Sequence, residues 1–377
     1  MATNLKSILF VVNSSSFFLS HRLALAVAAK NEGYTVHIAT ANGPDVSKIE
    51  SEGLIHHQIP FERSGQNLFS DLITFISLIK LFRVVRPSLV HLVTIKPVIY
   101  GGIAARIVRI KSVVAAISGL GTVFIDSTYK GYLRRLLVFK LYRTALKHHC
   151  LAVIFQNVDD RNTFLKKNLL KKKSCHIIRG SGVKLSNYPY LPEPSSTPIV
   201  IMAARLLKDK GVLEFIESAK ILKEQGIETT FRLVGESDLD NKTSVSQKFL
   251  KQCRAEDYVE LLGFREDIAD QYAKANIVCL PSYREGLPKS LVEAAACGRA
   301  VITTDVPGCR DAITPGITGL LCSVKDAKNL ANTIKKLIDD PIMRQEMGKS
   351  GRELAEAEFA IEHIVKKHIS IYDELTA

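Results

Sequence analysis

The sequence is poor in several features that mark particular classes of protein. It has no tryptophan and only 7% aromatic residues, so it offers few stacking platforms for single-stranded nucleic acid. Its seven cysteines include no Cys-x-x-Cys pair, which indicates reduced thiols rather than a disulfide framework or a zinc module. The most apolar stretches, residues 72–92 and 93–124, are interrupted by lysine and arginine, so neither predicts a membrane-spanning helix. The apolar run 7–12 is too short for a signal-peptide core, so we expect a cytoplasmic protein.

Acidic residues are scarce in the first half of the chain. The net charge is +13, and residues 1–190 hold 26 lysines and arginines against 9 acidic residues, whereas residues 191–377 hold 25 against 29. Between Leu72 and Val158 the only acidic residue is Asp126. This imbalance predicts a basic surface that meets an anionic partner, although the cations could also simply solvate helix faces.

The alternation of short apolar runs with amphipathic segments predicts two α/β domains with parallel sheets. A chain of 377 residues is too long for one ordinary core, and the proline-rich segment 188–198 interrupts the pattern as a linker would. We expect two Rossmann-like doubly wound domains, residues 1–188 and 189–357, which face each other across a cleft. A C-terminal helix over 358–377 is expected to pack back on the first domain. Helices are expected at 20–30, 212–225, 244–253 and 289–296, and strands at 7–13, 34–40, 88–93, 112–117, 199–203, 230–234, 259–262, 277–280 and 300–303.

The strongest chemical signal follows the expected strand 277–280. It reads Arg284-Glu285-Gly286-Leu287-Pro288-Lys289-Ser290-Leu291-Val292-Glu293. Pro288 is typical of a helix start, where free amide groups form an anion site. Glu285 precedes this helix and lies at the level of a bound group, whereas Glu293 lies inside the helix and can reach a polyol such as ribose. The alternative is an ordinary turn with a solvated carboxylate.

A second signal, residues 204–211, follows the expected strand 199–203. Arg205 and Lys210 are spaced to point into one cleft, where a departing nucleotide diphosphate needs fixed cations. The alternative is two surface cations, and Lys208 is expected to be exposed. Weaker signals follow two other strands, where glycine lets the backbone approach a ligand. They are Gly235 with Glu236, and Gly263 with Phe264 and Arg265, although Phe264 could equally be a packing residue.

The spacing of Glu285 and Glu293, with its flanks 280–282 and 295–298, resembles the paired-glutamate motif of glycosyltransferase family 4. This large retaining GT-B family includes bacterial capsule, O-antigen and lipid-linked oligosaccharide enzymes. The resemblance implies that Glu285 faces the donor sugar, that Glu293 binds the nucleotide ribose, and that the backbone of residues 286–289 contacts sugar and phosphate. It also implies that Arg205 and Lys210 hold the diphosphate, so that these two cations and Glu285 form the catalytic set. Residues 263–265 would border the nucleobase.

The first domain matches the family more loosely. The family often carries a Gly-Gly pair in its first loop, whereas residues 13–17 of this chain read Asn-Ser-Ser-Ser-Phe and contain no glycine. The close approach of Ser16 to the donor phosphate is therefore less well supported. His21, Ser118, Gly119 and Gly121 are expected on the acceptor side, although His21 could equally cap or pack. The run 118–121 lacks a third glycine at position 124, so the dinucleotide-binding fingerprint fails.

The resemblance implies a retaining glycosyltransferase. It would move an N-acetylhexosamine, such as N-acetylgalactosamine (GalNAc), from a UDP-sugar to an undecaprenyl-diphosphate-linked saccharide in surface polysaccharide assembly. The alternatives are a nonhydrolysing UDP-sugar epimerase of GT-B fold and a basic nucleic-acid-binding protein. No cofactor and no metal are predicted, because fixed cations and helix amides would carry the charge and an Asp-x-Asp metal motif is taken to be absent. A peripheral position on the anionic inner face of the plasma membrane is expected, through a basic helix with Arg134, Arg135, Lys140, Arg143 and Lys147.

Overall fold

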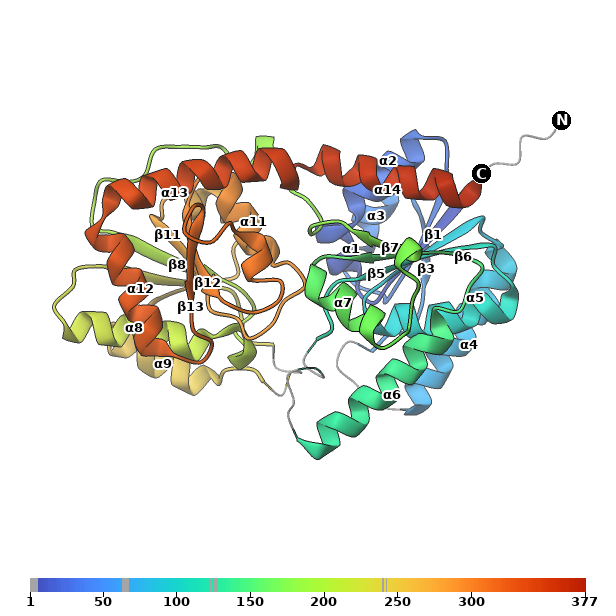
Figure 1. Ribbon diagram of the computed structural model, residues 1–377, viewed down its shortest axis with the longest axis horizontal. Coiled ribbons are helices and arrows are strands. Elements are labelled where there is room, and N and C mark those ends of the chain that lie inside the picture. The colour runs from blue at the N-terminus through green and yellow to red at the C-terminus, as the bar shows by residue number, and fades with distance from the viewer. Residues whose placement is uncertain (1–5, 63–67, 122–123, 125–127, 239–240, 242) are drawn as a thin grey trace. The chain divides into compact units, whose positions relative to one another are not determined.

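The computed structural model describes residues 6–62, 68–121, 124, 128–238, 241 and 243–377. The chain folds into two compact units, each a parallel sheet with helices packed against it (Figure 1). Unit 1 comprises Met1–Ser181 with Glu362–Ala377, and unit 2 comprises Gly182–Ile361. The division therefore falls after Ser181, whereas the proline-rich linker had suggested residue 188. Residues 182–188 belong to unit 2 because their contacts, described below, lie there.

Unit 1 is built on seven parallel strands in the order β3-β2-β1-β4-β5-β6-β7. The strands are β1 Ser7–Val12, β2 Thr35–Thr40, β3 Ile55–Gln58, β4 Leu89–Val93, β5 Ser112–Ile117, β6 Cys150–Phe155 and β7 Cys175–Ile177. The helices are α1 Ser15–His21, α2 Leu23–Asn31, α3 Val46–Ser51, α4 Leu68–Val85, the π-helix η1 Pro97–Gly101, α5 Gly102–Val108, α6 Tyr129–Ala145, α7 Val158–Lys166, η3 Lys172–Ser174 and α14 Ile361–Thr376.

The sheet of unit 1 is buried on both faces, which explains its nearly continuous apolar strands. In β1, Leu9 and Val11 pack into one core, whereas Phe10 and its neighbours pack into the other. The C-terminal helix α14 covers the second core, where the Tyr372 hydroxyl lies 2.5 Å from His91 Nδ1. The last helix of the chain is thus part of the core of unit 1.

One helix expected over 20–30 is in fact two helices. Ser14 caps α1 by accepting a hydrogen bond from the Phe17 amide at 3.4 Å, so the helix begins earlier than expected. The break falls at Arg22, whose backbone is not helical and whose buried guanidinium donates to the His21 carbonyl at 2.9 Å. His21 therefore ends α1 instead of lying in the first turn of the helix that follows.

Unit 2 is built on six parallel strands in the order β10-β9-β8-β11-β12-β13. The strands are β8 Ile199–Ala203, β9 Thr230–Val234, β10 Glu260–Gly263, β11 Ile277–Leu280, β12 Ala300–Thr304 and β13 Gly319–Cys322. The other elements are η4 Leu185–Asn187, η5 Lys208–Lys210, α8 Val212–Glu224, α9 Gln247–Ala255, α10 Ile268–Ala273, α11 Lys289–Ala296, η6 Arg310–Ala312, α12 Ala327–Asp339, α13 Pro341–Leu354 and η7 Ala355–Phe359. Helix α9 starts later than expected because Ser246 caps it.

The strand order of each sheet reverses once, and this reversal positions the site. In unit 2, β8 lies between β9 and β11, so the loop after β8 and the loop after β11 leave the sheet at its point of reversal. Open parallel sheets bind ligands at the carboxyl ends of such strands. Both strong sequence signals, residues 204–211 and 284–293, follow these two strands.

Candidate functional site

The loops after β8 and β11 in unit 2 pack tightly against each other. Gly211 has a φ of +78°, and a Cβ atom there would lie 2.1 Å from the Pro281 carbonyl oxygen. Only glycine combines this backbone conformation with this close approach. The Tyr283 amide donates to the Asp209 carbonyl at 2.9 Å and completes the junction. The glycine that ends the first motif therefore fixes it against the second.

Lys210 and Glu285 meet at this junction. Lys210 Nζ donates a hydrogen bond to Glu285 Oε1, and the two side chains are only 21% and 13% exposed. Ser282 Oγ lies 2.7 Å from the same carboxylate oxygen and 3.1 Å from the Asp209 carbonyl oxygen. Ser282 is itself buried, and its carbonyl accepts from the Thr304 hydroxyl. The carboxylate of Glu285 is thus held in one orientation by a cation and a hydroxyl.

A third loop, which follows β12, supports the backbone of Glu285. The Glu285 amide donates to the Pro307 carbonyl at 3.2 Å. Gly308 has a φ of +83°, and a Cβ atom there would lie 2.3 Å from the Glu285 carbonyl oxygen and 2.6 Å from that of Gly286. Gly308 was not predicted from the sequence, because a single glycine after a strand carries no specific signal.

Glu293 lies within α11, whose N-cap is Pro288. Its side chain is nearly buried, and Oε1 accepts a hydrogen bond from the Tyr188 hydroxyl at 2.6 Å. Lys289 Nζ lies 3.4 Å from the same oxygen. Burial, followed by the neighbouring carboxylate, raises the pKa of the Tyr188 phenol, so Tyr188 remains a protonated donor. Gly286, Leu287 and Pro288 are buried between the two glutamates.

Arg205 is not brought to the Lys210–Glu285 pair. It is half exposed, and its Nη1 lies 3.0 Å from Asp238 Oδ2 in the segment that follows β9. Arg205 stands where the chain leaves β8 beside β9, whereas η5 carries Lys210 back toward β11. Lys208 is exposed, as expected.

Asp238 also bears on the prediction that no metal is needed. That prediction took Asp-x-Asp motifs to be absent, which is wrong, because the sequence contains one such triplet at residues 238–240. Asp240 lies outside the described residues, and Asp238 pairs with Arg205. Within the described part of the chain, no group of three or more His, Cys, Asp or Glu side chains could hold a metal ion.

The weaker signals line the carboxyl ends of β9 and β10. A Cβ atom on Gly235, whose φ is +131°, would lie 1.9 Å from the Ala204 carbonyl oxygen, so this glycine lets two strand ends meet. Its amide donates to the Gly263 carbonyl at 2.8 Å. Phe264 is 69% exposed, which argues against a packing role.

The two charged side chains in these segments differ in their contacts. Glu236 is exposed, and its carbonyl accepts from the Leu206 amide at 3.0 Å. Arg265 donates twice to Asp267, at 2.7 Å each, and these hydrogen bonds hold the pKa of Asp267 below its usual value. Arg265 therefore reaches a ligand only by leaving this carboxylate.

In unit 1 the expected residues follow β1 and β5. Ser16 is exposed in α1, with its hydroxyl 2.9 Å from that of Ser14. His21, at the other end of α1, stacks on Phe17 with 4.0 Å between ring centroids. Ser16 and His21 therefore lie at opposite ends of one helix.

Ser118, Gly119 and Gly121 follow β5 directly, and the two glycines have φ angles of +106° and +71°. The Ser118 hydroxyl is buried and has no hydrogen-bond partner within the described part of the chain. This strand end, unlike α1, presents an unsatisfied polar group.

Thr94 is a further unusual residue at this edge, and it was not predicted from the sequence. It follows β4, has a φ of +74°, and leads into the π-helix η1. A β-branched residue in the left-handed region is a genuine outlier, and such strain gathers at functional sites. Its hydroxyl is buried without a partner among the described residues, like that of Ser118 on the neighbouring strand. Backbone conformation cannot be read from a threonine in a sequence.

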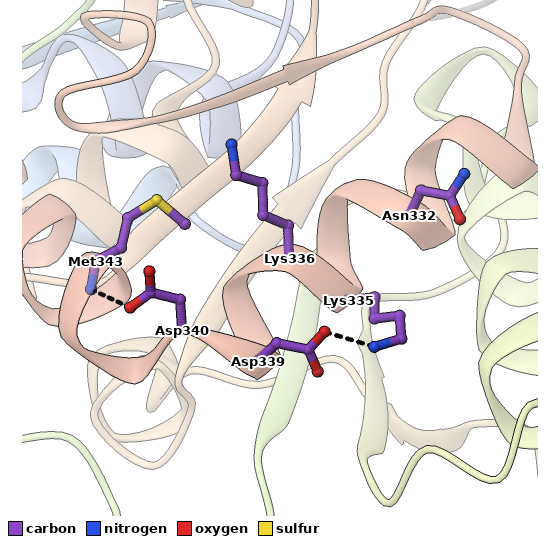
Figure 2. A pocket seen from close by; sticks show the side chains of 6 residues that line it. All are labelled: Asn332, Lys335, Lys336, Asp339, Asp340 and Met343. Atoms are coloured by element: carbon purple, nitrogen blue, oxygen red, sulfur yellow. Dashed lines mark hydrogen bonds and ion pairs between the residues drawn. The ribbon is translucent and has the colours of Figure 1, made fainter.

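A surface hollow in unit 2 lies apart from these residues. Figure 2 shows it between α12 and α13, and its lining residues are Asn332, Lys335, Lys336, Asp339, Asp340 and Met343. Lys335 pairs with Asp339, and Asp340 accepts from the Met343 amide as the cap of α13. These groups serve their own helices, and we assign the hollow no function.

Comparisons with known proteins show which family the chain is similar to. Residues 189–354 match the family model "Glycosyl transferases group 1", and residues 7–157 match "Glycosyl transferase 4-like". The chain is 30% identical to the N,N'-diacetylbacillosaminyl-diphospho-undecaprenol alpha-1,3-N-acetylgalactosaminyltransferase of Campylobacter jejuni, over 95% of this chain and 98% of that protein. It is 27% identical to the capsular polysaccharide biosynthesis glycosyltransferase CapM of Staphylococcus aureus, over 91% of each chain.

Solved structures show the same fold. A glycosyltransferase from Rickettsia africae aligns with a TM-score of 0.78 and 19% identity over 99% of each chain. HepE of Anabaena, solved in complex with UDP and glucose, aligns with a TM-score of 0.76 and 19% identity over 98% of this chain and 100% of that one. The fold is therefore GT-B, as the sequence predicted. With both family models matched and a relative 30% identical over nearly the whole chain, this protein belongs to the glycosyltransferases, in the group 1 family with a glycosyl transferase 4-like first half.

Proposed function

We propose that the chain transfers an N-acetylhexosamine, best GalNAc, from a UDP-sugar to an undecaprenyl-diphosphate-linked saccharide during assembly of a bacterial surface glycan. The Campylobacter relative is named for alpha-1,3-N-acetylgalactosaminyl transfer to N,N'-diacetylbacillosaminyl-diphospho-undecaprenol. An Escherichia coli relative, 24% identical over 83% of this chain, is named for alpha-1,3-galactosyl transfer from UDP-Gal to a GlcNAc-diphosphoundecaprenol. Both names specify an alpha linkage. If the donor is also alpha-linked to its diphosphate, the transfer retains configuration, and we propose a retaining reaction.

The Lys210–Glu285 pair is the observation that supports this chemistry most directly. A nucleotide diphosphate gains negative charge as its bond to the sugar breaks, and a fixed ammonium group stabilises that charge in a dry site. In the proposed reaction the acceptor hydroxyl bonds to the anomeric carbon on the face that UDP leaves. UDP keeps the electron pair of the broken bond and takes up the hydroxyl proton. Glu285 faces the sugar, and Glu293 binds the ribose.

The other predicted site residues take roles in this proposal. Residues 286–289 bring backbone groups to the donor sugar and phosphate, and Arg205 reaches the diphosphate after it leaves Asp238. Gly235, Glu236, Gly263, Phe264 and Arg265 border the nucleotide. On unit 1, Ser16 lies on the donor side, whereas His21, Ser118, Gly119 and Gly121 serve the acceptor.

An anionic membrane surface is the proposed partner of unit 1, because a polyprenyl acceptor is fixed in a bilayer. Helix α6 exposes Arg134 and Lys140, and it also exposes Tyr129, 75% exposed, and Leu137, 58% exposed. The start of α4 exposes Leu68 and other apolar side chains, and both helices pack against α5 and η1. Exposed apolar side chains among cations are typical of shallow insertion into anionic lipid. No helix among the described residues is long and apolar enough to cross a membrane.

A donor and acceptor panel tests this proposal. The purified protein is incubated with UDP- and GDP-sugars, each with and without lipid-diphosphate-linked saccharides of defined first sugar. We expect transfer from a UDP-N-acetylhexosamine only when the acceptor is present. A donor sugar that changes its configuration without any acceptor would instead identify an epimerase, and transfer from GDP-sugars alone would refute the UDP assignment.

A further inference from the structure

Tyr188 contacts the donor site from outside both sequence motifs. It lies far from Glu293 in the sequence, yet its hydroxyl donates to Glu293 Oε1 at 2.6 Å. A hydrogen bond from a neutral hydroxyl to a carboxylate is short and about twice as strong as one between neutral groups. Because both groups are nearly buried, little water competes for either of them.

Both ends of this contact are held in place. The Tyr188 side chain is 9% exposed, and its carbonyl accepts a hydrogen bond from Arg352 Nη1 at 2.8 Å. The same nitrogen donates at 2.6 Å to the carbonyl of Ala296, the last residue of α11, which carries Glu293. A single guanidinium thus ties the backbone of Tyr188 to the helix on which its partner lies.

The contact engages only one oxygen of the carboxylate. Tyr188 and Lys289 both lie on Oε1 of Glu293, and no hydrogen bond to Oε2 is found among the described residues. An ionised carboxylate can accept on both oxygens. The fixed carboxylate therefore keeps one oxygen available to the hydroxyl of a ligand.

We infer that Tyr188 is a positioning residue for nucleotide binding, which orients Glu293 so that its second oxygen accepts a ribose hydroxyl. This inference rests on the proposed function. It extends the donor site into residues 182–188, which join unit 2 through the hydrogen bond from the Val183 amide to the Phe359 carbonyl at 2.9 Å. Nucleotide recognition then depends on residues 182–188, which are the first residues of unit 2 after the chain leaves unit 1.

Calorimetry with UDP, 2′-deoxy-UDP and 3′-deoxy-UDP tests this role in the wild type and in Tyr188→Phe. Loss of an oriented charged hydrogen bond should weaken UDP binding about 10-fold. Wild-type protein should bind UDP more tightly than one of the two deoxy analogues. In Tyr188→Phe this ratio of affinities should fall by a similar factor, because only the ribose contact is lost. With UDP-sugar, KM should rise while kcat stays close to that of the wild type.

Tyr272→Phe is the matched control. Tyr272 is a buried tyrosine whose pKa is raised by burial and then by Glu293, yet its hydroxyl has no hydrogen-bond partner in the described part of the chain. Its replacement should leave UDP affinity and ribose discrimination unchanged. In a Glu293→Ala background, Tyr188→Phe should have no further effect, because the group that it positions is gone.

The outcomes separate this inference from the proposed function. If wild-type protein binds UDP but Tyr188→Phe binds it equally well, with unchanged discrimination, the positioning role is refuted and the proposed function stands. A further 10-fold loss on adding Tyr188→Phe to Glu293→Ala would also refute it. Absence of UDP binding in the wild type would refute both. Because discrimination is a ratio within one variant, a reduced folded fraction does not affect it.

Discussion

Lys210 and Glu285 show at the residue scale how one ion pair can prepare a site for an anionic donor. A partly buried lysine must be paired, and Glu285 pairs it while leaving the ammonium group at the carboxyl ends of β8 and β11. Ser282 and Gly308 then fix the carboxylate and its backbone. Contacts within the protein thus hold these groups of the site in place.

Glu285→Gln should strongly reduce sugar transfer while UDP still binds. The amide keeps the shape of the side chain but removes the charge that faces the donor sugar and loosens Lys210. We expect kcat to fall by about 100-fold or more, the scale seen when a preorganised electrostatic group is lost. Steady-state kinetics together with UDP calorimetry would check this, and a variant with wild-type kcat would contradict the role of Glu285.

Lys210→Ala and Arg205→Ala should differ in how far they lower kcat, a difference that the sequence alone did not suggest. Lys210 is positioned at the junction, so its loss should lower kcat by about 100-fold or more. Arg205 is half exposed and must leave Asp238 to reach a diphosphate. Asp238→Asn, which frees Arg205, should therefore leave turnover intact or raise it. If Arg205→Ala retained full activity, Arg205 would be a surface cation rather than a diphosphate ligand.

At the scale of the element, α6 carries the proposed membrane contact. Lys130→Glu with Arg134→Glu should weaken binding to anionic vesicles about 30-fold, since each cation near such a surface contributes about 1 kcal/mol. Both side chains are exposed. Lys248→Glu with Lys251→Glu makes the same charge change on α9 of unit 2 and should leave vesicle binding unchanged.

Vesicle sedimentation at low salt checks this prediction. If both double variants lost binding equally, net charge rather than α6 would be responsible. Transfer to a short-chain soluble acceptor should survive in both variants, because the reacting groups are untouched.

Helix α14 gives unit 1 a dependence on pH. His368 is buried on α14 near His91 and Arg22, and burial, followed by the charge of Arg22, lowers the pKa of His368 to about 3. In the unfolded chain this histidine takes up a proton near its ordinary pKa of 6.5, so the folded unit keeps its full stability above that pH. Stability should fall as the pH drops from 6.5 toward 3. Denaturant unfolding at a series of pH values would measure this.

His368→Gln should reduce that pH dependence without removing it, because burial also lowers the pKa of the neighbouring His91, whereas His363→Gln should leave it intact. His363 lies on the same helix but is exposed, so it serves as the matched control. An unchanged slope in His368→Gln would show that other groups cause the acid sensitivity.

At the scale of the whole molecule, the architecture followed from the sequence more fully than the site did. The expected strands recur in the structure because buried parallel strands are continuous apolar runs, as in β5. The break at Arg22 and the strained backbone at Thr94 were not foreseen, because both depend on tertiary packing. The Tyr188–Glu293 contact was missed for the same reason, since nothing local in the sequence links the two residues.

We propose that the protein transfers a sugar from a UDP-sugar to a lipid-linked saccharide. The most direct measurement is mass spectrometry of an undecaprenyl-diphosphate-linked saccharide after incubation with UDP-GalNAc and the wild-type protein, with NMR of the new linkage. The acceptor should gain one N-acetylhexosamine in alpha linkage, and Lys210→Ala should abolish most of that gain. An unchanged acceptor with every UDP-sugar tested, or a product of beta configuration from an alpha-linked donor, would contradict the proposed retaining transfer.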